Sequence, residues 1–217
     1  MTPTLFDDLE NPRQQTIALG TGVTMLKGFA LADAELLLEQ VREIAAISPF
    51  RHMVTPGGFT MSVGLTNCGR LGWVTDRSGY RYDPVDPATG RAWPSMPAVF
   101  ERLARNAAGE AGFGNFMPDA GLVNRYEPEA RLTLHQDKNE RDYDAPIVSV
   151  SLGLPARFLL GGLKRSDRTK SVPLIHGDVL VWGGPSRLRF HGVAPIREGH
   201  HPATGSYRIN LTFRRAE

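Results

Sequence analysis

The sequence has little of several features that would each define a class of protein. Only one cysteine, Cys68, occurs in the 217 residues, which excludes an internal disulfide framework and fits a reducing cytoplasm. No run approaches the roughly 18 consecutive apolar residues that a membrane-spanning helix needs, so we expect no membrane association. The first ten residues, MTPTLFDDLE, lack the basic and apolar regions of a secretory signal. Without repeats, and with 41% hydrophobic and 22% charged residues, the composition is that of an ordinary globular protein.

Net charge is also small, at +2, but it is distributed unevenly. Residues 156–217 contain 11 lysines and arginines against 4 aspartates and glutamates. An excess of this size is compatible with binding to a polyanion such as a nucleic acid. A solvated basic surface would give the same excess, so the charge alone leaves both interpretations open.

The N-terminal half of the chain predicts two helices. A strand is expected at residues 23–29. Apolar residues at the 3.6-residue period then predict a helix from about Asp33. This helix ends before Pro49, because the residue that precedes a proline avoids the helical region. A second helix is expected to begin near Ser95, with Pro97 in its first turn.

The insert between these helices, residues 48–95, is rich in glycine, proline and aromatic residues. Its segment 59–65 alternates apolar with small or polar residues, which predicts a strand. Residues 67–69 are expected to turn the chain toward a partner strand near Trp73. Long inserts of this kind are usually binding loops or lids. The alternative is a meandering β-layer whose aromatic side chains only fill the core.

From about residue 120 the sequence predicts only strands. Glycine, proline or aspartate turns separate them at regular spacing, which is typical of a jelly roll or a barrel. The eight expected strands are GLVNRYE, RLTLHQD, PIVSVSLG, ARFLLGG, SVPLIHG, DVLVWGG, RLRFHGV and SYRINLTFR.

One of these strands ends in a His-x-Asp pair. Side chains two residues apart on a strand point to the same side, so His135 and Asp137 can hold a metal from two points. A single pair of this kind is weak support for a metal site. His191, on a later strand with Phe190 on the opposite face, supplies a third ligand. Together they form the two-histidine, one-carboxylate set of non-haem Fe(II) oxygenases.

The other histidines suit this role less well. His176 and Asp178 lie between two apolar runs, where turn chemistry is expected, so we expect Asp178 to cap a turn. His200 and His201 lie in a loop rich in glycine and proline and are expected to be solvated.

The last strand carries an unusual polar face. Alternation places Arg208, Asn210, Thr212 and Arg214 on one side of the strand and apolar residues on the other. Arginines that point into a protein are uncommon unless they meet anions, and this pair could bracket a small dicarboxylate. The alternative is that one or both arginines pair with surface carboxylates.

In their order and spacing, the motifs NRY, HQD, HG and RINLTFR resemble those of the AlkB family of Fe(II)/2-oxoglutarate-dependent dioxygenases. The segments TPGGFTMSVGLTNCGRLGW, PIVSVSLGLPARF, GGLKR and HGDVLVWGG resemble the same family, so the likeness covers nearly the whole chain from about residue 20. It implies an α+β, mainly β fold: a double-stranded β-helix (jelly roll) with an N-terminal helical layer and a β-rich nucleotide-recognition lid. We expect one domain over 1–217, with a flexible tail at 1–13, an extension at 14–119 whose lid spans about 48–95, and the core at 120–217.

The resemblance also implies three groups of site residues. Iron would be held by the residues that are also catalytic, His135, Asp137 and His191. The cosubstrate 2-oxoglutarate would be held by Asn124, Tyr126, Arg208, Asn210 and Arg214. The target base would be held by Trp73, Tyr80, Tyr82, Asn139 and Arg165.

The implied activity is oxidative demethylation of N-alkylated bases such as 1-methyladenine and 3-methylcytosine. Fe(II) is the implied metal, 2-oxoglutarate and O2 are the cosubstrates, and the products are formaldehyde, succinate, CO2 and the repaired base. The implied partner is alkylated DNA, single-stranded or duplex, with RNA as a further candidate, and the base must leave its stack to reach a buried metal. We expect a cytoplasmic monomer. Two alternatives stay open: a 2-oxoglutarate-dependent hydroxylase of a protein or small molecule, and a catalytically silent nucleic-acid-binding module.

The chain departs from the family pattern at one position of the implied base pocket. Bacterial members have an acidic residue, in the run HQDKDE, where this chain has Asn139 in HQDKNE. An amide carries no negative charge, and we expect Glu140 and the π-face of Trp73 to replace part of the lost attraction for a cationic base. Preference for cationic over neutral methylated bases is therefore expected to persist but to be modest.

Overall fold

The computed structural model describes residues 15–217, so the tail expected at 1–13 lies outside the described residues. Two helices, a short 3-10 helix and fifteen strands are present in this range. In chain order they are β1 (Gln15–Gly20), β2 (Val23–Lys27), α1 (Ala34–Ile47), β3 (Gly64–Gly69), β4 (Gly72–Asp76), β5 (Gly79–Asp83), β6 (Val85–Asp86), β7 (Arg91–Ala92), α2 (Ala98–Glu110), β8 (Ala120–Tyr126), β9 (Leu132–His135), β10 (Ile147–Gly153), β11 (Ala156–Leu160), β12 (Lys170–Leu174), β13 (Val179–Trp182), η1 (Gly184–Ser186), β14 (His191–Val193) and β15 (Arg208–Arg214).

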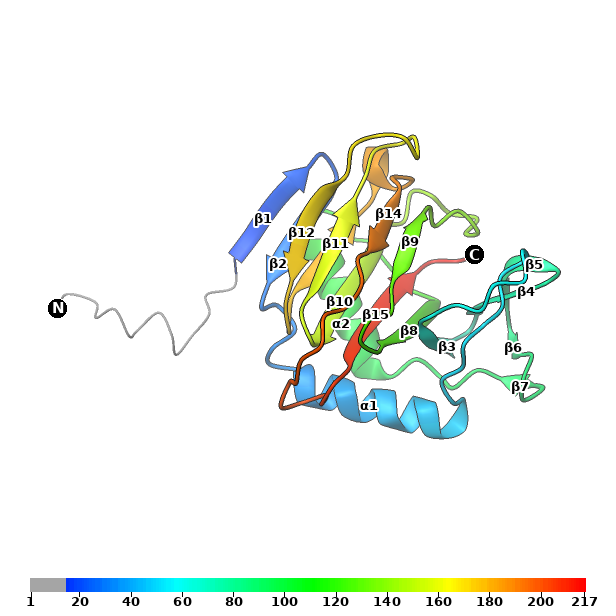
Figure 1. Cartoon of the computed structure of the whole chain (residues 1–217). Coiled ribbons are helices and arrows are strands. Elements are labelled where there is room, and N and C mark those ends of the chain that lie inside the picture. The colour runs from blue at the N-terminus through cyan, green and yellow to red at the C-terminus, as the bar shows by residue number, and fades with distance from the viewer. Residues whose placement is uncertain (1–14) are drawn as a thin grey trace.

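Two antiparallel sheets pack against each other, as Figure 1 shows. The larger sheet has the strand order β1-β2-β13-β10-β15-β8-β3, and the smaller has the order β12-β11-β14-β9. Phe158 and Leu160 of β11 meet Trp182 and Leu180 of β13 in the apolar layer between the sheets. The predicted double-stranded β-helix is confirmed, and β1 to β3, which precede residue 120, complete its larger sheet.

Both helices cover the outer face of the larger sheet. Phe100 of α2 meets Phe213 of β15 edge-on, with ring centroids 5.6 Å apart. The apolar face predicted for the last strand therefore lies against the helices, and its polar face points between the sheets. Both helices are confirmed, although Pro97 is the N-cap of α2 rather than part of its first turn. Within residues 15–217, neither helix is long and apolar enough to cross a membrane.

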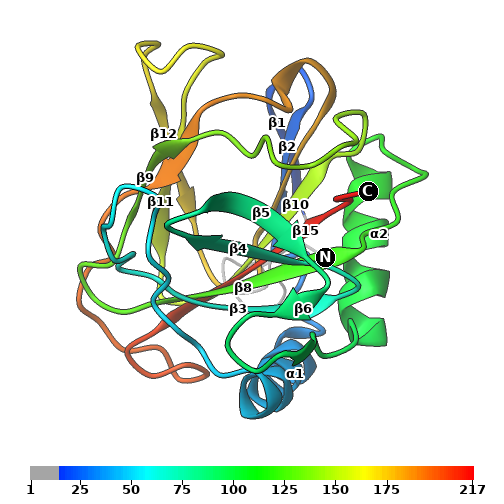
Figure 2. The ribbon, with the colours of Figure 1, turned by 90° about the vertical axis from the view of Figure 1, so that its right-hand side faces the viewer.

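The insert contains two small hairpins, β4–β5 and β6–β7. The β4–β5 hairpin lies across one end of the two sheets, in front of them in Figure 2 and at the right in Figure 1. We call this hairpin the lid, because its residues Trp73 and Tyr80 line the cavity described below.

Two details predicted for the insert are wrong. The strand expected at 59–65 begins only at Gly64, and Phe59 is 77% exposed. Residues 67–69 do not turn the chain toward Trp73, because they continue β3, which pairs with β8 at the edge of the larger sheet. Pairing with β8, which is distant in the sequence, buries the side chains of Leu65 and Cys68 and so keeps residues 67–69 extended. The strand that contains Trp73, β4, pairs with β5 instead.

All eight strands expected after residue 120 are present, some of them shorter than predicted. In RLRFHGV only His191–Val193 is strand, so Phe190 precedes the strand. Phe190 also lines the same cavity as His191, and the prediction that it lies on the opposite face is therefore wrong.

Candidate active site

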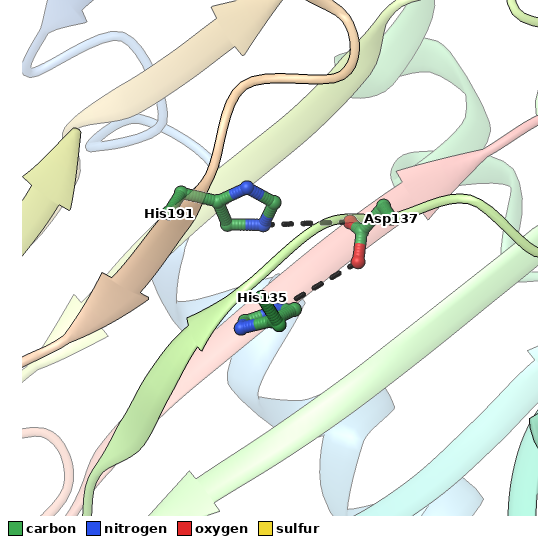
Figure 3. Close-up of side chains that lie close together, drawn as sticks. All are labelled: His135, Asp137 and His191. Carbon is green, nitrogen blue, oxygen red and sulfur yellow. Dashed lines mark ion pairs between the residues drawn. The ribbon is translucent and has the colours of Figure 1, made fainter. Parts of the chain in front are cut away.

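Two histidines and one aspartate meet between the sheets, as Figure 3 shows. His135 Nε2 lies 3.7 Å from Asp137 Oδ1, and His191 Nε2 lies 3.7 Å from Asp137 Oδ2. One ligand atom from each residue lies within 4.8 Å of the other two. We call these three residues the triad. Two imidazoles and a carboxylate on one side of a site are a donor set that suits Fe(II) and leaves positions open for other ligands.

Strand register brings the two histidines together. His191 of β14 is the direct cross-strand partner of His135 at the end of β9. Gly192 makes this pairing possible, because a Cβ at this position would lie 2.7 Å from the carbonyl oxygen of Leu132. The His-Gly motif therefore has a steric reason: the glycine lets the backbones of β14 and β9 approach closely.

The triad histidines present an unprotonated nitrogen to the site. His135 Nδ1 lies 2.8 Å from the carbonyl oxygen of Thr133, and His191 Nδ1 lies 3.0 Å from that of Arg189. A carbonyl can only accept, so Nδ1 carries the proton and Nε2 keeps its lone pair for a metal. Burial, and then the neighbouring His191, lower the pKa of His135 to about 4, which keeps this imidazole neutral.

The carboxylate of the triad is held ionised by an arginine of β15. Arg214 donates to Asp137 Oδ2 from Nη2 at 2.6 Å and from Nε at 3.0 Å. Burial by itself raises the pKa of Asp137, but the charge of Arg214 holds it well below its usual range. The site therefore offers a metal one charged and two neutral ligands.

Arg208, at the other end of β15, is a buried cation with free donors. It is 1% exposed, and its Nη2 donates to Ser151 Oγ at 2.9 Å. Its Nε and Nη1 have no hydrogen-bond partner within residues 15–217. Burial lowers the pKa of Arg208 to about 10. A buried guanidinium without a carboxylate is costly, so its environment is that of a receptor for an anion.

Two residues of β8 lie beside this arginine. Tyr126 and Asn124 are the cross-strand partners of Arg208 and Asn210. Asn124 Nδ2 donates to Asn210 Oδ1 at 3.1 Å, while Asn124 Oδ1 is buried and has no partner in the described chain. The unpaired donors beside these residues, Nε and Nη1 of Arg208, fit a small dicarboxylate such as 2-oxoglutarate, whose oxygens can only accept.

One cavity of about 1280 Å³ joins these groups. Its lining contains every residue that the sequence assigned to iron, to 2-oxoglutarate or to the base, except Tyr82. Phe158 and Trp182 form an apolar wall next to His191, with ring centroids 5.7 Å and 5.0 Å from the imidazole.

Known proteins with the same sequence pattern identify the family. The model of the 2OG-Fe(II) oxygenase superfamily matches residues 22–214. The alpha-ketoglutarate-dependent dioxygenase AlkB of Escherichia coli (strain K12) is 56% identical over 212 residues, which cover 98% of this chain and 97% of that protein. The chain belongs to the AlkB family of 2OG-Fe(II) oxygenases. As a dioxygenase of this family it uses Fe(II), 2-oxoglutarate and O2.

Two further relatives of this AlkB-family chain are more distant. The nucleic acid dioxygenase ALKBH1 of Mus musculus is 36% identical over 127 residues, 58% of this chain and 32% of that protein. The solved structure of OsALKBH1 has a TM-score of 0.81 and 30% identity, and the match covers 93% of this chain and all of the other.

The lid of this AlkB-family member offers an aromatic surface to the cavity. Trp73 and Tyr80 are stacked, with ring centroids 5.8 Å apart and planes 24° apart. The side chain of Asn67 accepts from the backbone N–H of Trp73 and donates to its carbonyl oxygen, both at 3.0 Å. Asn67 thus holds Trp73 as a neighbouring strand would, which the sequence did not indicate.

Arg165 and Asn139 lie on the cavity wall. Arg165 donates from Nη1 to the carbonyl oxygen of Leu134 at 2.7 Å and lies over the ring of Phe190, 5.1 Å from its centroid. Asn139 Oδ1 accepts a hydrogen bond from Trp73 Nε1 at 3.3 Å. The lid and the segment that follows the triad aspartate are therefore in direct contact.

Tyr82 and Glu140 lie elsewhere than the sequence suggested. Tyr82 donates to Glu140 Oε1 at 2.6 Å, and neither residue lines the cavity. Glu140 is 5% exposed, and its carboxylate pairs with Arg187 and Arg214, at 3.1 Å and 3.4 Å. The expectation that Glu140 replaces the missing charge at Asn139 is wrong, because its carboxylate faces inward.

Sequence reasoning missed Arg187. This residue is 2% exposed and donates from Nη1 to the carbonyl oxygen of Asp137 at 2.8 Å, so it fixes the backbone that carries the triad carboxylate. Its partner is Glu140. Strand alternation could not reveal it, since the residues before His191 are irregular.

The remaining histidine predictions are settled by hydrogen bonds and burial. Asp178 is buried and accepts from the backbone N–H groups of Ile175 and Gly28, both at 3.0 Å, so the predicted turn cap is confirmed. His200 is exposed as expected, whereas His201 is half-buried against His176, with ring centroids 4.4 Å apart.

Proposed function

We propose that this AlkB-family dioxygenase removes methyl groups from the ring nitrogens of bases in nucleic acids. The observation that carries the proposal is a single cavity lined by the triad, by a buried arginine with two unpaired donor nitrogens, and by the stacked aromatic pair of the lid. The mouse relative named a nucleic acid dioxygenase supports the class of substrate. Cationic bases such as 1-methyladenine and 3-methylcytosine and neutral methylated bases both have the flat shape that Trp73 could stack on.

The triad would hold Fe(II), and Arg208 and Arg214 with Asn124, Tyr126 and Asn210 would hold 2-oxoglutarate. Bound Fe(II), with 2-oxoglutarate and O2, supplies the oxidation of an N-methyl group to a hydroxymethyl group, which leaves as formaldehyde while 2-oxoglutarate becomes succinate and CO2. Arg214 keeps the triad carboxylate charged and oriented. Phe158 and Trp182 keep water from the side of His191.

The target base would enter the cavity under the lid. A base inside a duplex is out of reach of a site between two sheets, so it must flip out of its stack or come from a single strand. Trp73 then provides a π-face, with a cation–π contribution when the base is charged, and Arg165 and Asn139 provide polar contacts. We further propose that the chain works as one domain and as a monomer in the cytoplasm, on DNA and also on RNA.

The rival proposal is a 2-oxoglutarate-dependent hydroxylase of a protein or small molecule. A lid without base-stacking aromatics would favour that activity, and the stacked Trp73 and Tyr80 speak against it. A catalytically silent nucleic-acid-binding module needs no metal and therefore no Nε2 lone pair directed at a metal site. The orientation of both triad histidines speaks against that alternative.

Anaerobic reconstitution tests the proposal. The protein is loaded with Fe(II) and 2-oxoglutarate, then mixed with air and an oligonucleotide that contains one methylated base. We expect formaldehyde and succinate in equal amounts, and neither product from the His191→Ala variant. Succinate without formaldehyde, for every methylated oligonucleotide, would refute nucleic-acid demethylation. An unmethylated oligonucleotide is the matched control.

A further inference from the structure

The connection between β11 and β12 leaves the smaller sheet at the end that carries the triad. Leu160, the last residue of β11, is the cross-strand partner of His191, which in turn pairs with His135. In Figure 1 the connection projects beyond the ends of β11 and β12, at the top of the view. One of its side chains, that of Arg165, lines the cavity. The connection therefore begins beside the metal site and forms part of the cavity wall.

Residues 164–170 of this connection, which we call the basic loop, are exposed and strongly charged. The basic loop contains four of the 11 lysines and arginines in residues 156–217, namely Lys164, Arg165, Arg168 and Lys170. None of these four side chains pairs with a carboxylate of residues 15–217. The basic excess of the C-terminal part of the sequence is thus concentrated in one loop that carries cations without partners.

Backbone hydrogen bonds fix the shape of the basic loop. Asp167 Oδ2 accepts from the backbone N–H of Lys164, and the backbone N–H of Asp167 donates to the carbonyl oxygen of Lys164, both at 3.0 Å. At the base of the loop, the N–H of Gly161 donates to the carbonyl oxygen of Phe190 at 2.7 Å, and the N–H of Phe190 donates to that of Gly162 at 2.8 Å. None of these bonds uses a charged nitrogen of the loop, so its cations can meet an anion without a change in the backbone.

We propose that the basic loop contacts backbone phosphates of the strand that carries the target base, a few nucleotides away from that base. This inference rests on the proposed function and adds to it a binding surface outside the base cavity. Lysine and arginine side chains are the usual partners of phosphate oxygens in nucleic-acid complexes. Because its flipped base holds the target strand at the cavity, the phosphates of this strand are the anions nearest to the loop.

The length of the basic loop indicates which phosphates it reaches. Arg168 and Lys170 follow Arg165 by three and five residues, which an extended chain spans in at most about 11 Å and about 18 Å. Along one strand of DNA, a phosphate occurs every roughly 3.4 Å of helix axis. The outer cations of the loop therefore lie within reach of phosphates beyond the two that flank the target nucleotide.

The test measures the Kd of oligonucleotides by fluorescence anisotropy at several salt concentrations, on protein loaded with Fe(II) and 2-oxoglutarate and without O2. A methylated trinucleotide is compared with a longer single strand that has the same base and several nucleotides on each side. The triple variant Lys164→Gln, Arg168→Gln, Lys170→Gln removes three charges. For the longer strand, the slope of log Kd against log salt concentration should become shallower by about 2, because each contact contributes about 0.7. The trinucleotide is too short to reach the loop and should bind both proteins equally.

Two further variants check that charge is responsible. Asp167→Asn keeps an acceptor for the N–H of Lys164 and removes the one negative charge of the basic loop, so the longer strand should bind more tightly than to the wild type. Arg157→Gln removes an exposed cation of β11 that does not line the cavity, and both Kd values should stay unchanged. An unmethylated strand of the longer length should show the same change of slope in the triple variant, since phosphates do not depend on the base.

Three outcomes would overturn the inference. An unchanged slope in the triple variant would show that the basic loop does not contact phosphates. An equal loss of affinity for the trinucleotide and the longer strand would show that the substitutions act on the base cavity or on the fold. A slope that changes only when the longer strand is paired with its complement would assign the loop to the complementary strand. Failure of the proposed function is a separate result, absence of formaldehyde in air, because the slopes are measured without turnover.

Discussion

Replacing Arg208 by methionine is expected to weaken the binding of 2-oxoglutarate without lowering the stability of the ligand-free fold. Its guanidinium is 1% exposed, and two of its nitrogens have no partner within residues 15–217. Methionine at this position keeps much of the side-chain volume and removes the charge. We expect Arg208→Met to bind 2-oxoglutarate much more weakly and, without ligand, to be at least as stable as the wild type, because an uncompensated buried charge is lost.

The size of the binding effect follows from the hydrogen bonds available. A hydrogen bond to a charged group contributes about 1.5–3 kcal/mol, which corresponds to about a 10- to 150-fold change in Kd. At a 2-oxoglutarate concentration of about 100 times the wild-type Kd, the ligand should stabilise the wild type by about 2.7 kcal/mol. A variant whose Kd is 100-fold weaker should gain only about 0.4 kcal/mol under the same conditions.

Two measurements on Fe(II)-loaded protein without O2 check this: calorimetric titration with 2-oxoglutarate, and thermal unfolding with and without it. Arg157→Met is the matched control, since Arg157 lies on β11 and is exposed, and it should behave as the wild type in both. A wild-type Kd in Arg208→Met would refute the role assigned to Arg208. A ligand-free variant that unfolds well below the wild type would show that the guanidinium supports the fold instead.

Three more sets of substitutions test metal binding, folding stability and the titration of His176. Alanine at any triad position should abolish metal retention, whereas His176→Ala should retain the metal; metal analysis of the purified variants decides, and a triad variant that keeps full occupancy would contradict the assignment. Glu140→Gln leaves Arg187 buried without a charged partner and should lower the free energy of unfolding by about 3–5 kcal/mol. Tyr82→Phe removes only a hydrogen bond to Glu140 and should lower it by about 1 kcal/mol. Urea unfolding measures both losses, and equal losses would contradict the ion-pair argument. Burial, and then His201, keep the pKa of His176 below its ordinary value. At low pH the unfolded chain therefore binds a proton at His176 that the folded chain excludes. The folded state keeps its full stability above about pH 6.5 and loses the contribution of His176 as the pH falls. The slope of unfolding free energy against pH should therefore be smaller in His176→Gln, and identical slopes would show that His176 does not titrate differently on folding.

Local patterns in the sequence predicted the parts of the fold that depend on local periodicity. The two helices follow from apolar residues at the helical period, and the polar face of β15 follows from alternation over seven residues. The His-x-Asp pair brings the side chains of His135 and Asp137 close together because only one residue separates them in the chain. These features need no knowledge of the partner strands.

The features that the sequence did not predict depend on distant partners. β3 pairs with β8, more than fifty residues later, and turn propensity at residues 67–69 carries no information about that pairing. The inward direction of Glu140 is set by Tyr82, Arg187 and Arg214, which come from three separate segments. Adjacent residues on an irregular segment can face opposite ways, so Asn139 lines the cavity and Glu140 does not.

The histidines show how the backbone decides which imidazoles can bind a metal. In His135 and His191, Nδ1 faces the carbonyl oxygen of the residue two positions earlier, and the lone pair of Nε2 is therefore free. In His176, Nδ1 accepts from the N–H of Gly153 at 3.0 Å, so the neutral ring carries its proton on Nε2. Coordination through Nε2 would require that proton to move to Nδ1, which would then face another N–H. His-x-Asp spacing is the same at 135 and at 176, and the polarity of one backbone group distinguishes a histidine that offers an Nε2 lone pair to a metal from one that does not.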